Sequence, residues 1–139
     1  MPQLSSVLLV DDDTTTNFLN QMLIKRLGVV EHLHIAENGA EALQTLQQAC
    51  EPVSATCPDL ILLDMKMPVM NGIEFLEAYA RLPRPWQQGI VIVMLTTSLL
   101  PSDLERVQQL PVAGILNKPL TKEKLQALVD EHFGATPLG

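Results

Sequence analysis

The sequence contains few aromatic residues, few cysteines and few basic residues. Aromatic residues make up 4% of the chain, two positions are cysteine, and nine lysines and arginines stand against sixteen aspartates and glutamates. The resulting net charge is −7. An acidic chain without a basic cluster has little attraction for nucleic acid or for an anionic membrane surface, so we expect neither as a partner.

The chain also lacks a long apolar run and a secretion signal. Its longest uninterrupted apolar stretch is 90–95, which is too short to cross a bilayer. The first six residues carry no basic side chain and open no signal-like apolar segment, so we expect a cytoplasmic protein. Cys50 and Cys57 have neither Cys-x-x-Cys spacing nor a nearby histidine, and we expect them to be free thiols.

The sequence does contain a regular alternation of strand-like and helix-like segments. At 139 residues, of which 47% are apolar, the chain is long enough for one domain with a core. Short apolar strands joined by helices predict an α/β fold: a doubly wound, five-stranded parallel sheet with five helices. The expected strands are 5–10, 32–36, 60–64, 90–95 and 112–116, and the expected helices begin near Thr14, Asn38, Asn71, Ser102 and Thr121.

Local patterns predict how several of these helices begin and pack. Asn38, Asn71 and Ser102 are each followed three residues later by glutamate, the spacing of a capping box. Thr121 is expected to cap the last helix, which should end near His132 or Phe133. In the first helix, the leucines recur every four residues and predict one apolar face, made of Leu19, Leu23 and Leu27.

Three consecutive carboxylates, Asp11, Asp12 and Asp13, follow the apolar run at 7–10. Like charges at the end of a buried strand repel one another unless a cation neutralises them, and carboxylate oxygen suits a hard divalent cation. Aspartate is also favoured at the first turn of a helix, so the run alone is equally compatible with a metal site and with a helix cap.

Polar residues at the ends of the other strands decide between these interpretations. Asp64 ends the third strand, Thr96 follows the fourth, and Lys118 follows the fifth. The carboxyl ends of parallel strands share one edge of the sheet, where doubly wound folds bind ligands. Asp64 is a candidate phosphoryl-accepting nucleophile, Thr96 a hydroxyl donor and Lys118 a partner for a phosphoryl oxygen. Beside them, Asp11 and Asp12 are candidate Mg²⁺ ligands.

Four segments of the chain resemble the receiver domain of two-component response regulators. They are Val-Leu-Leu-Val-Asp-Asp-Asp at 7–13, Asp-Leu-Ile-Leu-Leu-Asp-Met-Lys-Met-Pro-Val-Met-Asn-Gly at 59–72, Val-Ile-Val-Met-Leu-Thr-Thr-Ser at 91–98 and Ile-Leu-Asn-Lys-Pro-Leu at 115–120. The resemblance implies a flavodoxin-like receiver fold over residues 5–133, with short tails at 1–4 and 134–139. We expect no output domain after the last helix, so the chain is similar to single-domain regulators and phosphorelay intermediates; the alternative is a domain excised from a longer protein.

The resemblance implies a role for each site residue. Asp64 corresponds to the phosphoacceptor, and Asp11 and Asp12 to the Mg²⁺ pair. Lys66 would give its backbone carbonyl to the metal. Thr96 and Lys118 correspond to the switch hydroxyl and the phosphate-binding lysine, and the Lys118–Pro119 bond is expected to be cis. The implied partners are a histidine kinase or histidine phosphotransfer protein and an unknown output protein, and Lys66 and Ser98 would flank the phosphoryl group and tune its hydrolysis.

Four positions depart from the family pattern. Asp13 extends the acidic pair, and we interpret it as the cap of the first helix. Ile115 stands where the family has a switch aromatic, which puts the usual coupling between threonine and aromatic in question. The loop from Cys50 to Pro58 is long, and Asn71 replaces the aspartate that many relatives carry before the glycine.

Two other functions remain open from the sequence. Asp11 to Thr15 also matches the Asp-x-Asp-x-Thr start of haloacid-dehalogenase-like phosphatases, in which Asp11 would be the nucleophile and Asp13 the general acid. That interpretation leaves the setting of Asp64 unexplained, and no acidic metal-binding pair follows Lys118 at the end of an expected strand. The third possibility is a receiver-like binding module that works without phosphorylation. The absence of an aromatic residue at the switch position favours this interpretation.

Overall fold

The computed structural model describes residues 4–50, 57–82, 90–97 and 100–133. Within these ranges, five strands and five helices alternate along the chain. The strands are β1 (Leu4–Val10), β2 (Val30–Ala36), β3 (Leu60–Asp64), β4 (Val91–Thr96) and β5 (Gly114–Asn117). The helices are α1 (Thr14–Leu27), α2 (Gly39–Cys50), α3 (Gly72–Ala80), α4 (Pro101–Gln108) and α5 (Lys122–Phe133).

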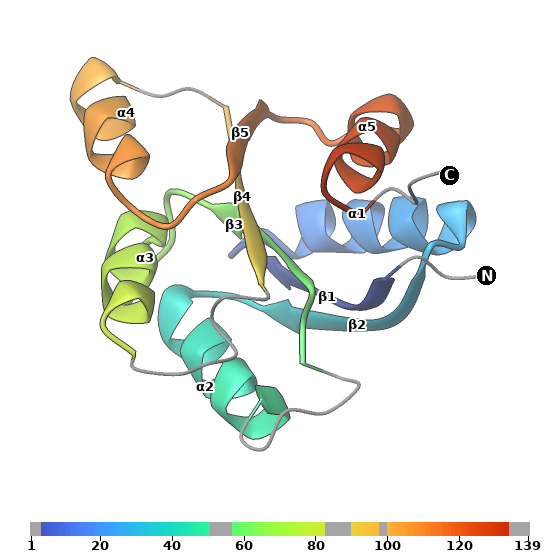
Figure 1. Ribbon diagram of the computed structural model, residues 1–139, viewed down its shortest axis with the longest axis horizontal. Helices are drawn as coiled ribbons and strands as arrows, with labels where there is room; N and C mark the ends of the chain where they lie inside the picture. Colours follow the sequence, from blue (N-terminus) through green and yellow to red (C-terminus); the bar gives the residue numbers. More distant parts are fainter. Residues whose placement is uncertain (1–3, 51–56, 83–89, 98–99, 134–139) are drawn as a thin grey trace.

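The strands form one parallel sheet in the order β2-β1-β3-β4-β5, with helices on both faces (Figure 1). The predicted doubly wound parallel sheet is confirmed. The strand bounds differ most at β2, which begins at Val30 rather than His32, and at β5, which begins two residues later and ends one residue later than expected. None of the helices in the described ranges is long and apolar enough to cross a membrane.

Two apolar cores lie on the two faces of the sheet. One joins β1, β3 and β4 to α2, α3 and α4, and the other joins the same strands to α1 and α5. Strand β3 serves both cores: Leu60 and Leu62 belong to the α1/α5 side, and Ile61 and Leu63 to the opposite side. Successive side chains of a strand point to opposite faces, so a strand covered on both sides is apolar at every position.

The predicted apolar face of α1 is wrong in part. Leu23 and Leu27 are half-buried against the core, but Leu19 is 57% exposed. The residues of α1 that are fully buried are Asn17, Asn20 and Ile24. The helix is therefore rotated so that two asparagines, which the leucine spacing does not predict, face the sheet.

The predicted side-chain caps are confirmed for α2, α3 and α5, and the cap predicted for α4 is wrong. Asn71 and Glu74 form the complete capping box at the start of α3, Asn38 accepts from the Glu41 amide, and Thr121 accepts from the Lys124 amide. The capping box predicted at Ser102 is absent from α4, which begins one residue earlier with Pro101 in its first turn and has no side-chain cap. Proline suits this position because the first helical amide needs no partner.

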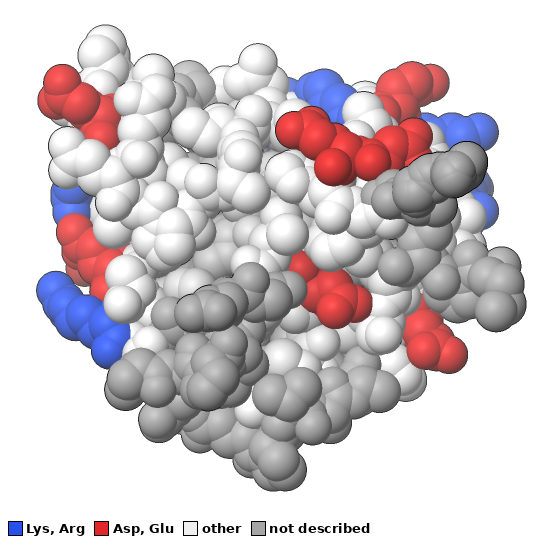
Figure 2. Space-filling model, viewed as in Figure 1, with Lys and Arg blue, Asp and Glu red and all other residues white. Residues whose placement is uncertain are grey.

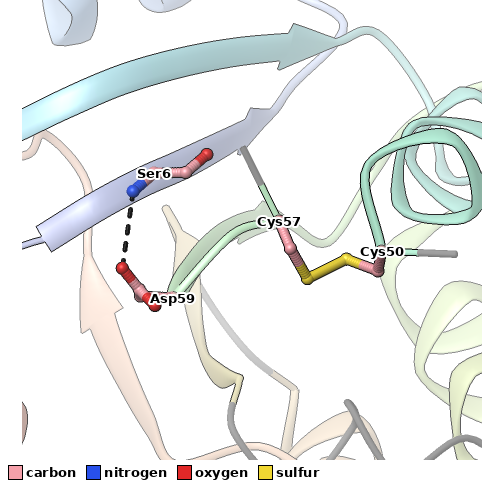
Figure 3. The surroundings of a disulfide bond; sticks show 4 residues. All are labelled: Ser6, Cys50, Cys57 and Asp59. Carbon is pink, nitrogen blue, oxygen red and sulfur yellow. Dashed lines mark hydrogen bonds between the residues drawn. A yellow bond between two sulfur atoms is a disulfide. The ribbon is translucent and has the colours of Figure 1, made fainter. Parts of the chain in front are cut away.

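The expectation of free thiols is wrong, because Cys50 and Cys57 form a disulfide (Figure 3). The bond joins the last residue of α2 to the segment before β3, and both cysteines are buried. Spacing rules missed it because the fold brings the two cysteines together, at the end of α2 and in the segment before β3. The loop residues 51–56 between them lie outside the described ranges.

Asp59 joins three strands next to this disulfide. Its carboxylate accepts from the Ser5 amide at 2.7 Å and from the Ser6 amide at 3.4 Å, the contact drawn in Figure 3. Its own amide donates to Ser6, and its carbonyl accepts from Val91. Asp59 therefore aligns β1, β3 and β4 at the edge of the sheet opposite the strand ends that carry the predicted site.

Candidate functional site

The predicted site residues come together at the carboxyl edge of the sheet. Asp11 follows β1, Asp64 is the last residue of β3, Thr96 is the last residue of β4, and Lys118 follows β5. Asp11, Asp64 and Thr96 are buried. The backbone holds this edge together, because the Lys118 amide donates to the Thr96 carbonyl at 2.8 Å.

Three of the carboxylates form a compact acidic cluster. Asp11, Asp12 and Asp64 each offer an oxygen, and these oxygens lie within 4.8 Å of one another. Asp12 is exposed while the other two are buried, so the cluster opens to solvent on one side. Three converging carboxylate oxygens with one open side fit Mg²⁺, which takes few protein ligands and keeps several waters. Lys66, two residues after Asp64, has an exposed side chain.

The Lys118 ammonium binds both buried carboxylates of the cluster. Its Nζ atom lies 2.7 Å from Oδ2 of Asp11 and 3.1 Å from Oδ1 of Asp64. Burial disfavours the charged form of this lysine, but hydrogen bonds to the two carboxylates outweigh that effect and raise its pKa. Lys118 is therefore a fixed positive charge beside Asp64. The Lys118–Pro119 bond is cis, as predicted.

Asp64 lies where ionisation is costly. Burial and then the charge of Asp11 raise its pKa, and the contact with Lys118 lowers it by less. A carboxylate that is partly desolvated and has one cation beside it loses hydration that would otherwise shield it from an electrophile. The setting suits a nucleophilic carboxylate better than a structural cap.

Asp13 is the N-cap of α1, as predicted. Its carboxylate accepts from the Thr15 amide at 3.0 Å and from the Thr16 hydroxyl at 2.8 Å. The hydrogen bond from Thr16, followed by that from the Thr15 amide, lowers the pKa of Asp13. A carboxyl group held in its ionised form and turned into a helix end is a poor general acid, which weighs against the phosphatase interpretation.

The segment after Asp64 has no room for a side chain at Gly72. A Cβ at this position would collide with the backbone carbonyl oxygen of Asp64 and contact the Cα of Met65 at 3.0 Å. The Gly72 amide also donates to the Met65 carbonyl. The start of α3 therefore packs directly against the backbone that carries Asp64. This close packing explains why the motif has glycine at position 72.

One contact to the acidic cluster was not expected from the sequence. Nδ2 of Asn17 donates to the backbone carbonyl of Asp11 at 2.7 Å. Asparagine in a helix is usually exposed, so the sequence does not predict this contact, which depends on the rotation of α1. Ile115, by contrast, is half-buried against the core at the predicted switch position, and Ser98 lies outside the described ranges.

Charge on the visible surface agrees with the composition. On the face drawn in Figure 2, acidic side chains form several small groups, and lysine and arginine side chains lie toward the edges of the view. The described residues on this face form no broad basic patch.

The family of the chain follows from comparison with known proteins. The model of the response regulator receiver domain matches residues 7–130. The chain therefore belongs to the response regulator receiver family. Receiver domains are signalling modules rather than substrate-turnover enzymes, so the phosphatase interpretation is not retained.

Relatives and solved structures agree with this assignment. The probable chemotaxis protein CheY of Rhizobium etli is 30% identical over 129 residues, which span 93% of this chain and 92% of that protein. The crystal structure of a two component response regulator from Cytophaga hutchinsonii has a TM-score of 0.81 and 29% identity, and covers 94% of this chain and 97% of its own. The crystal structure of the Mn(2+)-bound form of response regulator Rcp1 has a TM-score of 0.73 and 29% identity. The match covers 96% of this chain and 98% of Rcp1.

Proposed function

We propose that this receiver accepts a phosphoryl group on Asp64, in a two-component or phosphorelay system. The observation that carries the proposal is the position of Asp64: a buried carboxylate at the end of the central strand, 3.1 Å from the Lys118 ammonium and within the acidic cluster. In the transfer, a carboxylate oxygen of Asp64 forms a bond to phosphorus. The bond from phosphorus to the donor breaks, and the donor leaves with its electron pair.

We propose that Asp11, Asp12 and Asp64, with the backbone carbonyl of Lys66, hold Mg²⁺ at this site. Support comes from the three converging carboxylates and from the Mn(2+)-bound form of the related regulator Rcp1. A bound Mg²⁺ would neutralise charge on the incoming phosphoryl oxygens.

Two residues of the neighbouring strands would respond to the new charge. Lys118 already pairs with Asp64 and would pair with a phosphoryl oxygen, and the buried Thr96 hydroxyl would donate to another. Both residues belong to the edge formed by β4 and β5, so we propose that the surface of α4, β5 and α5 changes when Asp64 is phosphorylated. Lys66 would lie beside the phosphoryl group and influence its hydrolysis.

The proposed donor is a histidine kinase or a histidine phosphotransfer protein, and the output protein is unknown. The receiver unit we propose spans residues 5–133. A receiver that binds its partner without phosphorylation remains the second candidate, because Ile115 occupies the position of the switch aromatic and is only half-buried.

Phosphorylation of single-residue variants tests the proposal. A small phosphodonor with Mg²⁺ should label the wild type and leave Asp64→Asn unlabelled. Asp13→Asn is the matched control: it is the same substitution close to the cluster, and asparagine caps helices as well as aspartate. This variant should be labelled like the wild type.

Mapping the labelled residue separates the alternatives. A phosphoryl group on Asp64 supports the proposal, whereas one on Asp11 would support the phosphatase chemistry instead. Equal labelling of the wild type and Asp64→Asn would refute the assignment of the phosphoacceptor. A wild type that takes no label but still binds an output protein would favour the binding module.

A further inference from the structure

The inner face of α1 is polar where the helix lies nearest the acidic cluster. Asn17 is 3% exposed and Asn20 is 8% exposed, whereas Phe18 on the outer face is 59% exposed. Burial of an amide costs free energy unless each polar atom is hydrogen-bonded. Leucine in place of either asparagine would suit a purely structural face better, so these two side chains need a different explanation.

The side chain of Asn17 is only half satisfied. Its Nδ2 donates to the backbone carbonyl of Asp11, but its Oδ1 is buried and has no hydrogen-bond partner among the described residues. A buried carbonyl oxygen left without a donor costs about 1–3 kcal/mol. This atom marks a position at which a small hydrogen-bond donor would be stabilised.

A small cavity lies beside Asn17, and the residues that line it include Asp11 and Asp64. Its volume is about 10 Å³, close to the space that one water molecule needs. The polar part of its lining is Asp11, Asn17, Asn20 and Asp64, and apolar side chains of the sheet complete it. A bound water also needs two or more polar partners, and this lining offers four polar side chains.

We propose that this cavity binds one water molecule, which donates one hydrogen bond to Oδ1 of Asn17 and one to the carboxylate of Asp64. A water molecule can donate to the unpartnered oxygen of Asn17, and the Lys118 ammonium already supplies a positive charge beside Asp11 and Asp64. Asn17 is then a positioning residue for the cluster: it holds Asp11 through the backbone carbonyl and Asp64 through the water.

The effect on metal binding rests on the proposed function of the cluster. Asn17→Leu keeps the number and branching of the side-chain heavy atoms but removes both hydrogen bonds. Loss of groups that orient metal ligands typically lowers metal affinity by about 10–100-fold. We therefore expect the Kd for Mg²⁺, measured by calorimetry without a phosphodonor, to rise at least about tenfold.

Asn20→Leu is the matched control for Asn17→Leu. The two asparagines lie one turn apart on the same buried face, but only Asn17 bonds to the Asp11 carbonyl among the hydrogen bonds of the described residues. Asn20→Leu should therefore change the Kd for Mg²⁺ much less. Equal changes in the two variants, or no change in Asn17→Leu, would overturn the positioning role.

The water itself is tested by nuclear magnetic resonance on the wild type. Cross-relaxation between a long-lived water and the Asn17 side-chain amide is expected in the wild type, and the water signal should vanish in Asn17→Leu. Absence of the signal in the wild type would overturn the proposal, even if the variant failed to fold. Because this measurement needs neither Mg²⁺ nor a phosphodonor, a wild type that shows the water but takes no phosphoryl group would refute the proposed function alone.

Discussion

At the scale of single residues, the acidic cluster combines two buried carboxylates with one ammonium. Lys118 contacts both Asp11 and Asp64, and burial together with the charge of Asp11 still raises the pKa of Asp64. One cation does not fully neutralise the pair. The site therefore retains a negative charge that destabilises the folded protein and favours the binding of an additional cation.

This imbalance predicts the effect of pH on stability. With its pKa raised above the ordinary 3.8, Asp64 binds a proton more tightly in the folded than in the unfolded chain. Stability contributed by this group falls as pH rises through the raised pKa. Without Mg²⁺, Asp64→Asn should therefore be more stable than the wild type at pH 7. The difference in unfolding free energy should shrink as the pH falls through the raised pKa of Asp64.

Urea unfolding at a series of pH values measures this difference. Asp12→Asn serves as the control, because Asp12 is exposed and its loss should give a smaller gain. An Asp64→Asn variant that is less stable than the wild type at pH 7 would show that the contact with Lys118 outweighs the burial of the carboxylate.

Steric limits at Gly72 give a second residue-scale prediction. Gly72→Ala would place a Cβ against the backbone of Asp64, and overpacking of this kind costs about 1–3 kcal/mol. Gly114→Ala is the control, since a Cβ there meets nothing within 4 Å. Thermal unfolding should show a loss for Gly72→Ala only, and an equal change in both variants would contradict the collision.

At the scale of elements, the disulfide fixes the end of α2 to the segment just before β3. The cysteines are seven residues apart, and closing a loop of this length stabilises a fold by about 2–3 kcal/mol through the entropy of the unfolded chain. Replacing both Cys50 and Cys57 by alanine should lower the free energy of unfolding by roughly that amount.

The same change should spare the phosphorylation of Asp64. Cys57 precedes the amino end of β3, whereas Asp64 lies at its carboxyl end. Urea unfolding with and without reductant provides the control, because reductant should destabilise the wild type and leave the double variant unchanged. A wild type insensitive to reductant would indicate that the bond contributes nothing to stability.

Helix ends were predictable from the sequence where the residues that form the cap are close together in the chain. The capping box at Asn71 and the cap at Asp13 depend on residues three or fewer positions apart, and both are confirmed. The rotation of α1 was not predictable, because it depends on the polar residues that the helix packs against. The disulfide was missed for a similar reason: its two cysteines are brought together by the ends of different elements.

At the scale of the whole molecule, the order of the strands gathers the site residues. Asp11, Asp64, Thr96 and Lys118 come from four strand ends, and their common edge was predictable because all parallel strands end on the same side of a sheet. The contribution of Asn17 was not predictable, since a sequence does not record which atoms remain without a partner in the folded state.

A whole-molecule prediction concerns the surface next to Thr96 and Lys118. Phosphorylation of Asp64 should change amide hydrogen exchange in α4, β5 and α5, because the hydroxyl and the lysine would be drawn toward the phosphoryl group. Asp64→Asn treated with the same phosphodonor is the control, and α2 should change less in the wild type. Unchanged exchange in α4, β5 and α5 of a fully phosphorylated protein would contradict this switch.

The side chains of strand β3 do not by themselves fix its register with the neighbouring strands, since all four residues before Asp64 are apolar and buried. A slip of one residue would exchange the side chains of the two cores, and would move the Asp64 carboxylate by about 3.3 Å and to the other face. The register is fixed before the amino end of the strand, by the hydrogen bonds that the Ser5 and Ser6 amides donate to the Asp59 carboxylate. The position of the proposed phosphoacceptor is thus set in part by a carboxylate at the opposite edge of the sheet.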